Sequence, residues 1–320
     1  MNKQDKIREL LFNKYSQNLK MLVENGVLDL ELPFAETYMC PICMKFFSRE
    51  DLNQQSANPL TLEDVPFKSL GGSPVILTCR KCNNFCGQNI DYHLVERMRQ
   101  LDHSQFMPET ETNASFERNG IKIQGRIRVE KDGTIMAIHM MKRNNPNVFE
   151  RFIKDNLPDT LLNIAFFRTP VKPDMIHLAL LKIGYLLVFE KYGYAFICDD
   201  EKQRIRNQLL NPDKFTYPIG FWLQPPNGVI DFGVPIITQL GYEAFLPVFP
   251  LITSRTQRPF AVIIPMTKRP VEEIISTIQG EFRNSPTLTL EMSKLNDDYL
   301  LSIDSVRHTK NWIEKRCQES

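Results

Sequence analysis

The chain has 320 residues, of which 42% are hydrophobic and 24% are charged, and its formal net charge is +1. This length leaves room for two domains, or for one large domain with a small appendage. The composition is typical of a globular protein with a substantial apolar core, and the near-neutral charge excludes a global field that would attract nucleic acid or a membrane surface. The longest apolar stretch, at 183–189, is much shorter than the roughly 20 residues that span a bilayer.

The cysteine content bears on the cellular compartment. There are seven cysteines, but the chain begins Met-Asn-Lys-Gln-Asp-Lys and shows no apolar leader segment. We therefore expect a cytoplasmic protein in a reducing environment, without a membrane partner. In that setting, paired Cys-x-x-Cys motifs indicate a bound metal rather than a disulfide framework.

The first predicted element is an amphipathic helix over residues 4–25. Its apolar residues recur at helical spacing, and Asn25-Gly26 provides a helix stop. A helix of this kind covers part of a core with its apolar face. Residues 27–39 are expected to be extended.

Residues 40–100 form a module framed by two cysteine pairs. Both pairs have Cys-x-x-Cys spacing, and they consist of Cys40 with Cys43 and of Cys79 with Cys82. Each motif can place two thiolates on one face of a tight turn, so the four cysteines fit one tetrahedral structural zinc. Cysteines that served only as small buried residues would not produce two such pairs.

The segment between the pairs predicts a hairpin. We expect a strand at 60–64, an irregular loop that contains Pro66 and Gly71-Gly72, and a second strand at 75–78. After Asn83 the chain is predicted to be helical to about residue 100. The expected order is therefore cysteine turn, strand, loop, strand, cysteine turn and helix.

The rest of the chain alternates between helical and strand patterns. Residues 102–115 are polar with little periodicity, and we place a linker there. Apolar and polar residues alternate at 121–129, and Asp132-Gly133 follows, which predicts a β-hairpin. Helices are expected at 147–156, 173–192 and 199–210, and the second is apolar nearly all round, so it should be the buried centre of its domain. Strands are expected at 232–237, 244–249 and 260–264.

The predicted fold class is α+β. We expect the N-terminal helix and the four-cysteine zinc module at residues 1–101, the linker at 102–115, and a larger strand-rich α+β domain at 116–320. This second domain shows no nucleotide-binding loop, no Ser/His/Asp signature and no clustered metal ligands. Its sequence therefore indicates a role in recognition or assembly.

The order of motifs in the module resembles the zinc-containing HNH endonucleases. The matching residues, all within residues 38–100, are Cys40, Cys43, Glu63, Asp64, Pro66, Gly71, Gly72, Cys79, Cys82, Asn83 and Gly87. The resemblance covers under a quarter of the chain. It implies a ββα-metal fold of treble-clef type, with one catalytic Mg²⁺ or Mn²⁺ where the hairpin meets the helix. It also implies cleavage of phosphodiester bonds by metal-assisted hydrolysis.

In that family an acidic residue followed by a histidine ends the first strand; the acid binds the metal and the histidine is the general base. Here Glu63 takes the place of the acid, and Asp64 stands where the histidine would be. Aspartate has an ordinary pKa near 3.9 and histidine near 6.5, so Asp64 is the weaker base at neutral pH. Three outcomes are open: Asp64 acts as a poor base, His93 supplies the base or a ligand, or the site is inactive.

Three polar residues after the second cysteine pair complete the candidate site. Asn83 resembles the family residue that ties down the loop after the first strand, and it can equally be a helix N-cap. Asp91 is a candidate cation ligand and His93 a candidate catalytic residue. Because they are two residues apart, they point roughly 200° apart on an ideal helix, and only an irregular turn would let both face one metal.

Two functions are compatible with these patterns. The first is a metal-dependent HNH-like endonuclease that hydrolyses DNA, with a role in bacterial defence against foreign DNA. The alternative is a catalytically inactive zinc-binding module that binds nucleic acid or a protein partner. Assembly with another protein or with a second copy of the chain is also open, with residues 116–320 as the interaction surface.

Overall fold

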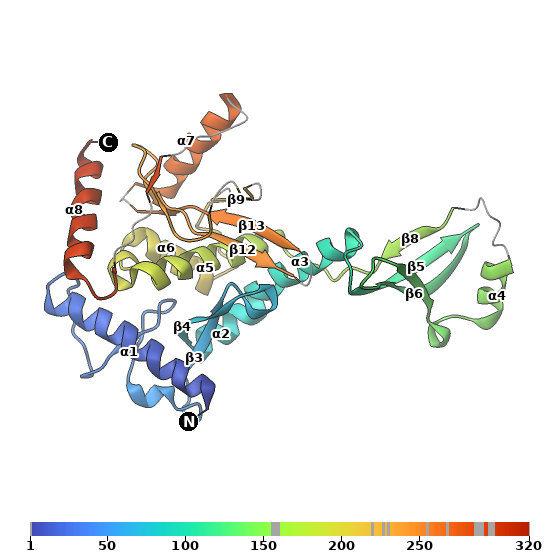
Figure 1. Ribbon diagram of the computed structural model, residues 1–320, viewed down its shortest axis with the longest axis horizontal. Coiled ribbons are helices and arrows are strands. Elements are labelled where there is room, and N and C mark those ends of the chain that lie inside the picture. The colour runs from blue at the N-terminus through green and yellow to red at the C-terminus, as the bar shows by residue number, and fades with distance from the viewer. Residues whose placement is uncertain are drawn as a thin grey trace. The chain divides into compact units, whose positions relative to one another are not determined.

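The computed structural model describes residues 2–154, 161–218, 221–225, 228, 231–253, 256–266, 269–284, 291–293 and 298–319, without the side chains of 281–284 and 317–319. The chain forms two compact units (Figure 1). Unit 1 contains Met1–Leu94, Lys172–Leu251 and Gln257–Ser320, and unit 2 contains Val95–Val171 and Ile252–Thr256. Among the described residues, no helix combines the length and the apolar character needed to cross a membrane.

Unit 1 begins with helix α1 (Lys3–Glu24), which confirms the predicted N-terminal helix. A capping box fixes its start, because the side chains and backbone amides of Asn2 and Asp5 are hydrogen-bonded reciprocally. On the buried face of the helix, the Tyr15 ring stacks on that of Phe189 with 4.6 Å between the ring centroids. Helix α1 thus covers part of the core, as its apolar spacing predicted.

Two antiparallel hairpins follow α1. Strand β1 (Tyr38–Met39) pairs with β2 (Phe46–Phe47), and the one-turn helix η1 (Arg49–Leu52) comes next. Strand β3 (Leu60–Val65) pairs with β4 (Ser73–Cys79), which confirms the predicted hairpin. The register of β3 shifts between Glu63 and Asp64, so a bulge lies at the two acidic residues.

The connection between β3 and β4 explains the paired glycines. It contains the one-turn helix η2 (Lys68–Leu70), and Gly71 closes that turn with a φ of +87°. Gly72 lies so close to Pro66 that a Cβ atom on it would meet the Pro66 carbonyl oxygen at 1.4 Å. Any other residue at position 72 would force the loop to move.

The helical segment after β4 differs from the prediction in two ways. Helix α2 (Arg80–Cys86) begins before Asn83, because Cys79 at the end of β4 is its N-cap. A π-helical turn, η3 (Gly87–Asp91), then separates α2 from helix α3 (Tyr92–Ser104). A π turn is wider than an α turn, so it changes the direction in which the following side chains point.

Helix α5 (Pro173–Tyr192) is the buried centre of unit 1, as its apolar sequence predicted. Pro173 occupies its first turn, where a missing amide hydrogen costs nothing, and Gly193 ends it with a φ of +70°. The one-turn helix η5 (Tyr194–Phe196) follows. One charged residue, Lys182, lies in the middle of α5 and is fully buried.

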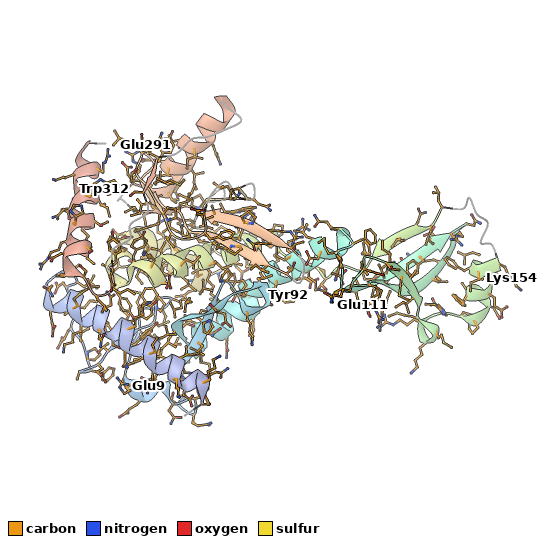
Figure 2. The ribbon with its side chains drawn as sticks, viewed as in Figure 1. Glu9, Tyr92, Glu111, Lys154, Glu291 and Trp312 are labelled. Carbon is orange, nitrogen blue, oxygen red and sulfur yellow. The ribbon has the colours of Figure 1, made fainter. Side chains whose placement is uncertain are left out.

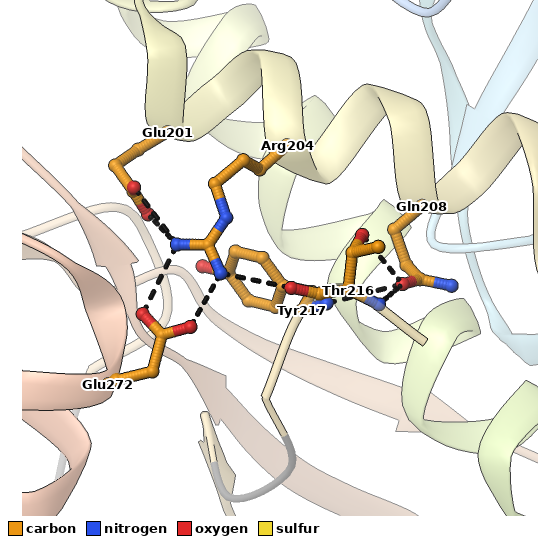
Figure 3. A network of polar contacts seen from close by, with 6 residues as sticks. All are labelled: Glu201, Arg204, Gln208, Thr216, Tyr217 and Glu272. Carbon is orange, nitrogen blue, oxygen red and sulfur yellow. Dashed lines mark hydrogen bonds and ion pairs between the residues drawn. The ribbon is translucent and has the colours of Figure 1, made fainter. Parts of the chain in front are cut away.

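Helix α6 (Asp200–Leu210) fastens two neighbouring segments of unit 1. Figure 3 shows Arg204 between Glu201 of the same helix and Glu272 of helix α7 (Val271–Asn284); its Nη2 atom lies 2.5 Å from Glu272 Oε1. Gln208 Oε1 accepts the two backbone amide hydrogens of residues 216–217 at 2.6 and 3.2 Å. These polar contacts fix α7 and the 216–217 segment to α6.

The remaining strands of unit 1 form two small sheets of order β14-β11-β10-β15 and β12-β13-β9. Their bounds are β9 (Trp222–Leu223), β10 (Ile236–Ile237), β11 (Ala244–Phe245), β12 (Val248–Ile252), β13 (Gln257–Val262), β14 (Ile264–Pro265) and β15 (Met292–Ser293), and helix α8 (Ile303–Glu319) follows. Of the strands expected from the sequence, the one at 232–237 is shorter and corresponds to β10. The one at 244–249 is divided between β11 and β12, and the one at 260–264 is divided between β13, which begins earlier, and β14. Pro247, which has no amide hydrogen for pairing, separates β11 from β12. The Trp222 indole of β9 donates to His177 Nδ1 of α5 at 2.5 Å.

Unit 2 is built on an antiparallel sheet of order β7-β6-β5-β8. Its elements are β5 (Thr110–Arg118), β6 (Ile121–Val129), β7 (Ile135–His139), the one-turn helix η4 (Met141–Arg143), helix α4 (Pro146–Lys154) and β8 (Asn163–Phe166). Val148, Phe149 and Phe152 of α4 pack on a cluster that includes Ile123 and Ile127 of β6. The alternation at 121–129 therefore reflects one sheet face covered by α4, and the predicted hairpin at Asp132-Gly133 is confirmed.

The compact units do not follow the division expected from the sequence. Residues 102–115, expected to be a linker, form the end of α3 and most of β5, an inner strand of the sheet. They are polar because β5 exposes one face, not because they lack structure. The boundary falls inside α3, after Leu94, and the chain returns to unit 1 at Lys172. Residues 1–101 and 116–320 are therefore not separate compact bodies.

Candidate metal centre and the adjoining charge cluster

The four predicted zinc ligands converge. The Sγ atoms of Cys40, Cys43, Cys79 and Cys82 all lie within 4.8 Å of one another, and those of Cys43 and Cys79 are 3.8 Å apart. Zn–S bonds of about 2.3 Å in a tetrahedron separate the sulfurs by about 3.8 Å, so the spacing fits one zinc ion. The thiols are free of disulfides. Within the part of the chain that the structure describes, this is the one group of three or more His, Cys, Asp or Glu side chains close enough to share a metal ion.

Two different local structures present the cysteine pairs. Cys40 and Cys43 lie in the tight turn between β1 and β2, where the Met44 amide donates to the Cys40 carbonyl at 2.8 Å and Met44 itself has a φ of 57°. Cys79 and Cys82 lie where β4 enters α2. The Cys79 amide donates to Cys40 Sγ at 3.5 Å, a contact that stabilises thiolate charge and joins the two pairs.

A zinc ion held by four cysteines has no open coordination position, so its role is structural. Cys86 is also buried nearby, but burial raises the pKa of its thiol to about 12. Its thiol is not among the sulfur atoms that lie within 4.8 Å of one another. Cys86 is a small buried residue, and the metal group consists of the four paired cysteines.

The two candidate cation ligands, Glu63 and Asp91, come together around an ammonium group. Lys182 Nζ of α5 lies 2.7 Å from Glu63 Oε1 and 2.7 Å from Asp91 Oδ2. Lys182 is fully buried, and Glu63 and Asp91 are only 4% and 9% exposed. The second carboxylate oxygen of Glu63 accepts a hydrogen bond from Thr78 Oγ1 at 2.9 Å. We call Glu63, Asp91 and Lys182 the buried charge cluster.

One ammonium in this cluster faces two carboxylates. Burial lowers the pKa of Lys182, but the charges of Glu63 and Asp91 outweigh burial and raise it, so the lysine is charged at neutral pH. Burial raises the pKa of Asp91 to about 6, against the opposing effect of Lys182. Asp91 Oδ1 is buried and has no hydrogen-bond partner among the described residues. The ammonium group of Lys182 thus holds the cluster together. The cluster contains two carboxylates but only one ammonium, so one carboxylate charge has no matching positive charge within it.

The buried charge cluster, as arranged, does not fit a divalent cation. Mg²⁺ needs a near-octahedral shell of oxygens at about 2.0–2.1 Å and usually keeps several waters. Here both Glu63 oxygens are already bonded, and an ammonium group lies between the carboxylates. Burial of all three side chains leaves no room for the waters or for a phosphate.

Asp64, at the position of the family's general base, lies outside this cluster. It is half-buried and makes no hydrogen bond or ion pair with any residue that the structure describes. Burial and the charge of Glu63 raise its pKa, and Lys68 opposes them. The raised pKa makes Asp64 a better proton acceptor than an ordinary surface aspartate.

Asn83 connects helix α2 to the first strand of the hairpin. Its side-chain amide donates to Thr61 Oγ1 at 3.0 Å and to the Leu62 carbonyl at 3.2 Å. Because Cys79 is the N-cap of α2, the capping alternative for Asn83 does not hold. The tether reaches strand β3 itself rather than the loop that follows it.

Asp91 and His93 share no partner, although the turn before them is irregular. Asp91 pairs with Lys182, whereas His93 Nδ1 accepts the backbone amide hydrogen of Lys172 at 3.2 Å. Burial and the nearby Lys172 charge lower the pKa of His93, so the ring is neutral at pH 7. With Nδ1 as the acceptor, the proton of the neutral ring is on Nε2.

Lys182 is the member of the buried charge cluster that the sequence patterns did not single out. It is the one Lys, Arg, Asp or Glu between Asp174 and Glu190, in a helix that is apolar on all sides. A charge in such a helix must find a buried partner. The isolated lysine in an apolar helix was therefore the signal in the sequence from which the cluster could have been inferred. The identity of the partners could not be inferred, because Asp91 is 91 residues away in the chain.

No protein-family model matches this chain, and comparison with curated proteins and with solved structures gives no match. The likeness to HNH endonucleases accordingly rests on the motifs of residues 38–100 alone.

Proposed function

We propose that this protein is a zinc-stabilised nucleic-acid-binding protein whose HNH-like module is a scaffold and not a metal-dependent nuclease. The observation that carries the proposal is the position of Lys182, whose ammonium group lies 2.7 Å from both candidate cation ligands. The four cysteines fit one zinc ion, and the ammonium group of Lys182 lies between the two carboxylates that were the candidate cation ligands.

The ammonium group cannot replace the divalent cation in hydrolysis. A catalytic metal ion polarises the phosphate and stabilises the leaving oxygen by direct coordination, which requires open positions on the ion. Lys182 is fully buried and bonded to two carboxylates, so a phosphate has no access to it. The cluster instead resembles a structural ion pair that fastens the module to α5.

Two features support nucleic acid as the ligand. The motif order of the module resembles a family that acts on DNA. In addition, strand β6 of unit 2 exposes Arg126 and Arg128, and Arg168 is exposed after β8. Arginine side chains are among the common donors to nucleic-acid phosphates.

The experiment combines a binding and a cleavage assay on the zinc-loaded protein. We expect labelled DNA or RNA to be retained with an affinity that falls as salt rises, and plasmid DNA to stay intact with Mg²⁺ or Mn²⁺. Mn²⁺-dependent nicking that disappears in Glu63→Gln would overturn the scaffold role. Absence of salt-dependent retention of every nucleic acid tested would overturn the binding role.

A second candidate, the metal-dependent endonuclease, is favoured by Asp64. This aspartate is half-buried, unpaired among the described residues, and has a raised pKa, as a general base requires. For this function, Lys182 would have to leave Glu63 and Asp91 before a cation could bind. The Lys182→Met variant tests this, because it should then bind Mn²⁺ and nick plasmid faster than the wild type.

A further inference from the structure

Unit 2 contains a polar pocket of about 420 Å³ beside the sheet face that α4 does not cover. Its walls come from β5, β6, helix α3 and the segment that follows β8. Among its lining residues are Glu111 and Asn113 of β5, Arg126 of β6, Arg99 of α3, and Phe167 and Arg168. Figure 2 labels Glu111 on the sheet and Lys154 on α4.

Strand register places the residues of β5 and β6 on the exposed face. Asn113 lies opposite Arg126, and Glu111 lies opposite Arg128, while Ile123 and Ile127 of β6 point to α4. Phe167 continues the pairing of β8 with β5, because its amide donates to the Asn113 carbonyl at 3.0 Å. We call the exposed side chains of Glu111, Asn113, Arg126, Arg128, Phe167 and Arg168 the arginine face.

The arginine face has more guanidinium than carboxylate groups. Glu111 is shared between Arg126 and Arg128, each at 2.8 Å. Arg99, at the rim, is bonded to Glu96 at 2.8 Å. Arg168 is exposed and has no hydrogen bond or ion pair with any described residue. One carboxylate shared by two arginines leaves several N–H donors of both directed to solvent, and Arg168 adds an uncompensated charge.

An exposed aromatic ring lines the same pocket as Arg126 and Arg168. Phe167 is 48% exposed and directly precedes Arg168. The segment is held in place, since the Gln100 side-chain amide donates to the Thr169 carbonyl at 2.6 Å. An exposed ring, guanidinium groups that line the same pocket, and the Asn113 side-chain amide, which bonds to none of the described residues, are the elements that bind an unstacked base and its phosphate. A pocket of this volume lies within the range of small-ligand sites.

We propose that the arginine face of unit 2 binds single-stranded nucleic acid, with a base stacked on Phe167 and its phosphates bound by Arg126 and Arg168. This inference rests on the proposed nucleic-acid-binding function and gives its site. A duplex would not serve as well, because its bases are already stacked and cannot lie on the ring.

The test uses the full-length zinc-loaded protein and a fluorescein-labelled oligothymidylate of about 12 nucleotides, followed by anisotropy. Phe167→Ala should weaken binding about 10-fold. Arg168→Ala should weaken it about 5-fold and lower the salt dependence by about one phosphate contact. The matched controls are Ile153→Ala and Arg151→Ala, which change an exposed apolar residue and an exposed arginine of α4; both should bind like the wild type. Unfolding midpoints of all four variants check that they are folded.

The outcomes separate the site from the function. Oligonucleotide binding that Phe167→Ala and Arg168→Ala leave unchanged overturns the arginine face and leaves the proposed function standing. Failure of the wild type to bind any nucleic acid overturns both. Binding of a polyglutamate peptide that Arg168→Ala weakens, without binding of the oligonucleotide, assigns the face to an acidic protein and also overturns the inference.

Discussion

Replacement of Lys182 by methionine tests the central geometric claim, that one ammonium stabilises two buried carboxylates. Methionine nearly preserves the length of the side chain, so the change removes the charge and leaves little cavity. Loss of one partner from a buried ion pair costs about 3–5 kcal/mol, because the remaining charge is left uncompensated. Here two carboxylates, 4% and 9% exposed, lose the same partner, so we expect Lys182→Met to lower the free energy of unfolding by about 4–5 kcal/mol at pH 8.

The pH dependence of this loss has a defined sign. The folded-state pKa of Asp91 is about 6, above its ordinary value of 3.8, so its proton binds more tightly in the folded than in the unfolded chain. The stability that this shift contributes is fully present below about pH 4 and is lost as the pH rises through about 6. Without Lys182 the pKa of Asp91 rises further, and protonation relieves the repulsion. The deficit of Lys182→Met relative to the wild type should therefore shrink between pH 8 and pH 5.

Urea unfolding of the zinc-loaded protein, followed by tryptophan fluorescence, measures this deficit, since Trp222 and Trp312 both belong to unit 1. The matched control is Lys191→Met, which removes a partly exposed lysine from the last turn of the same helix and should cost less than about 1 kcal/mol. The triple variant with Glu63→Gln and Asp91→Asn should recover most of the loss. A deficit under about 1 kcal/mol, or one that grows as the pH falls, would refute the account of the cluster.

Three further predictions concern other parts of unit 1. Metal analysis should find about one zinc ion per chain in the wild type and in Cys86→Ser. Cys79→Ser should retain no zinc after treatment with a chelator. Gly72→Ala should cost at least about 2 kcal/mol in urea unfolding, because its Cβ would collide with backbone, whereas Gly87→Ala, in open space at helical φ and ψ, should be neutral or slightly stabilising. Burial lowers the pKa of His177, so the hydrogen bond that it accepts from its indole partner should persist at pH 7 and break only on acidification below the ordinary histidine range, as a change in tryptophan fluorescence; a spectrum that stays unchanged on acidification would contradict it.

Local patterns predicted the elements of this fold well, because each is encoded by neighbours in the chain. The four cysteines, the β3–β4 hairpin and helix α5 lie where spacing and apolar runs indicated. The π turn at Gly87–Asp91 has no comparable signal, since its tertiary partner is helix α5, where Asp91 pairs with Lys182 far away in the chain. The linker prediction at 102–115 was wrong for a similar reason. A polar segment with one exposed face has the pattern of a loop until its pairing partners are known.

The candidate site shows a limit of a different kind. The spacing of motifs in the sequence could indicate that Glu63 and Asp91 lie near one another, but it could not indicate which positive charge lies between them. A divalent ion and a lysine ammonium satisfy the same two carboxylates, and only the second is contributed by the chain itself. Since Lys182 belongs to the central helix of unit 1, the acidic pair is bonded to the core of the unit and not to a separable module. A change that opens the pair to a cation must therefore also remove a charge from that core, so any gain of metal binding at this site should be accompanied by a loss of stability.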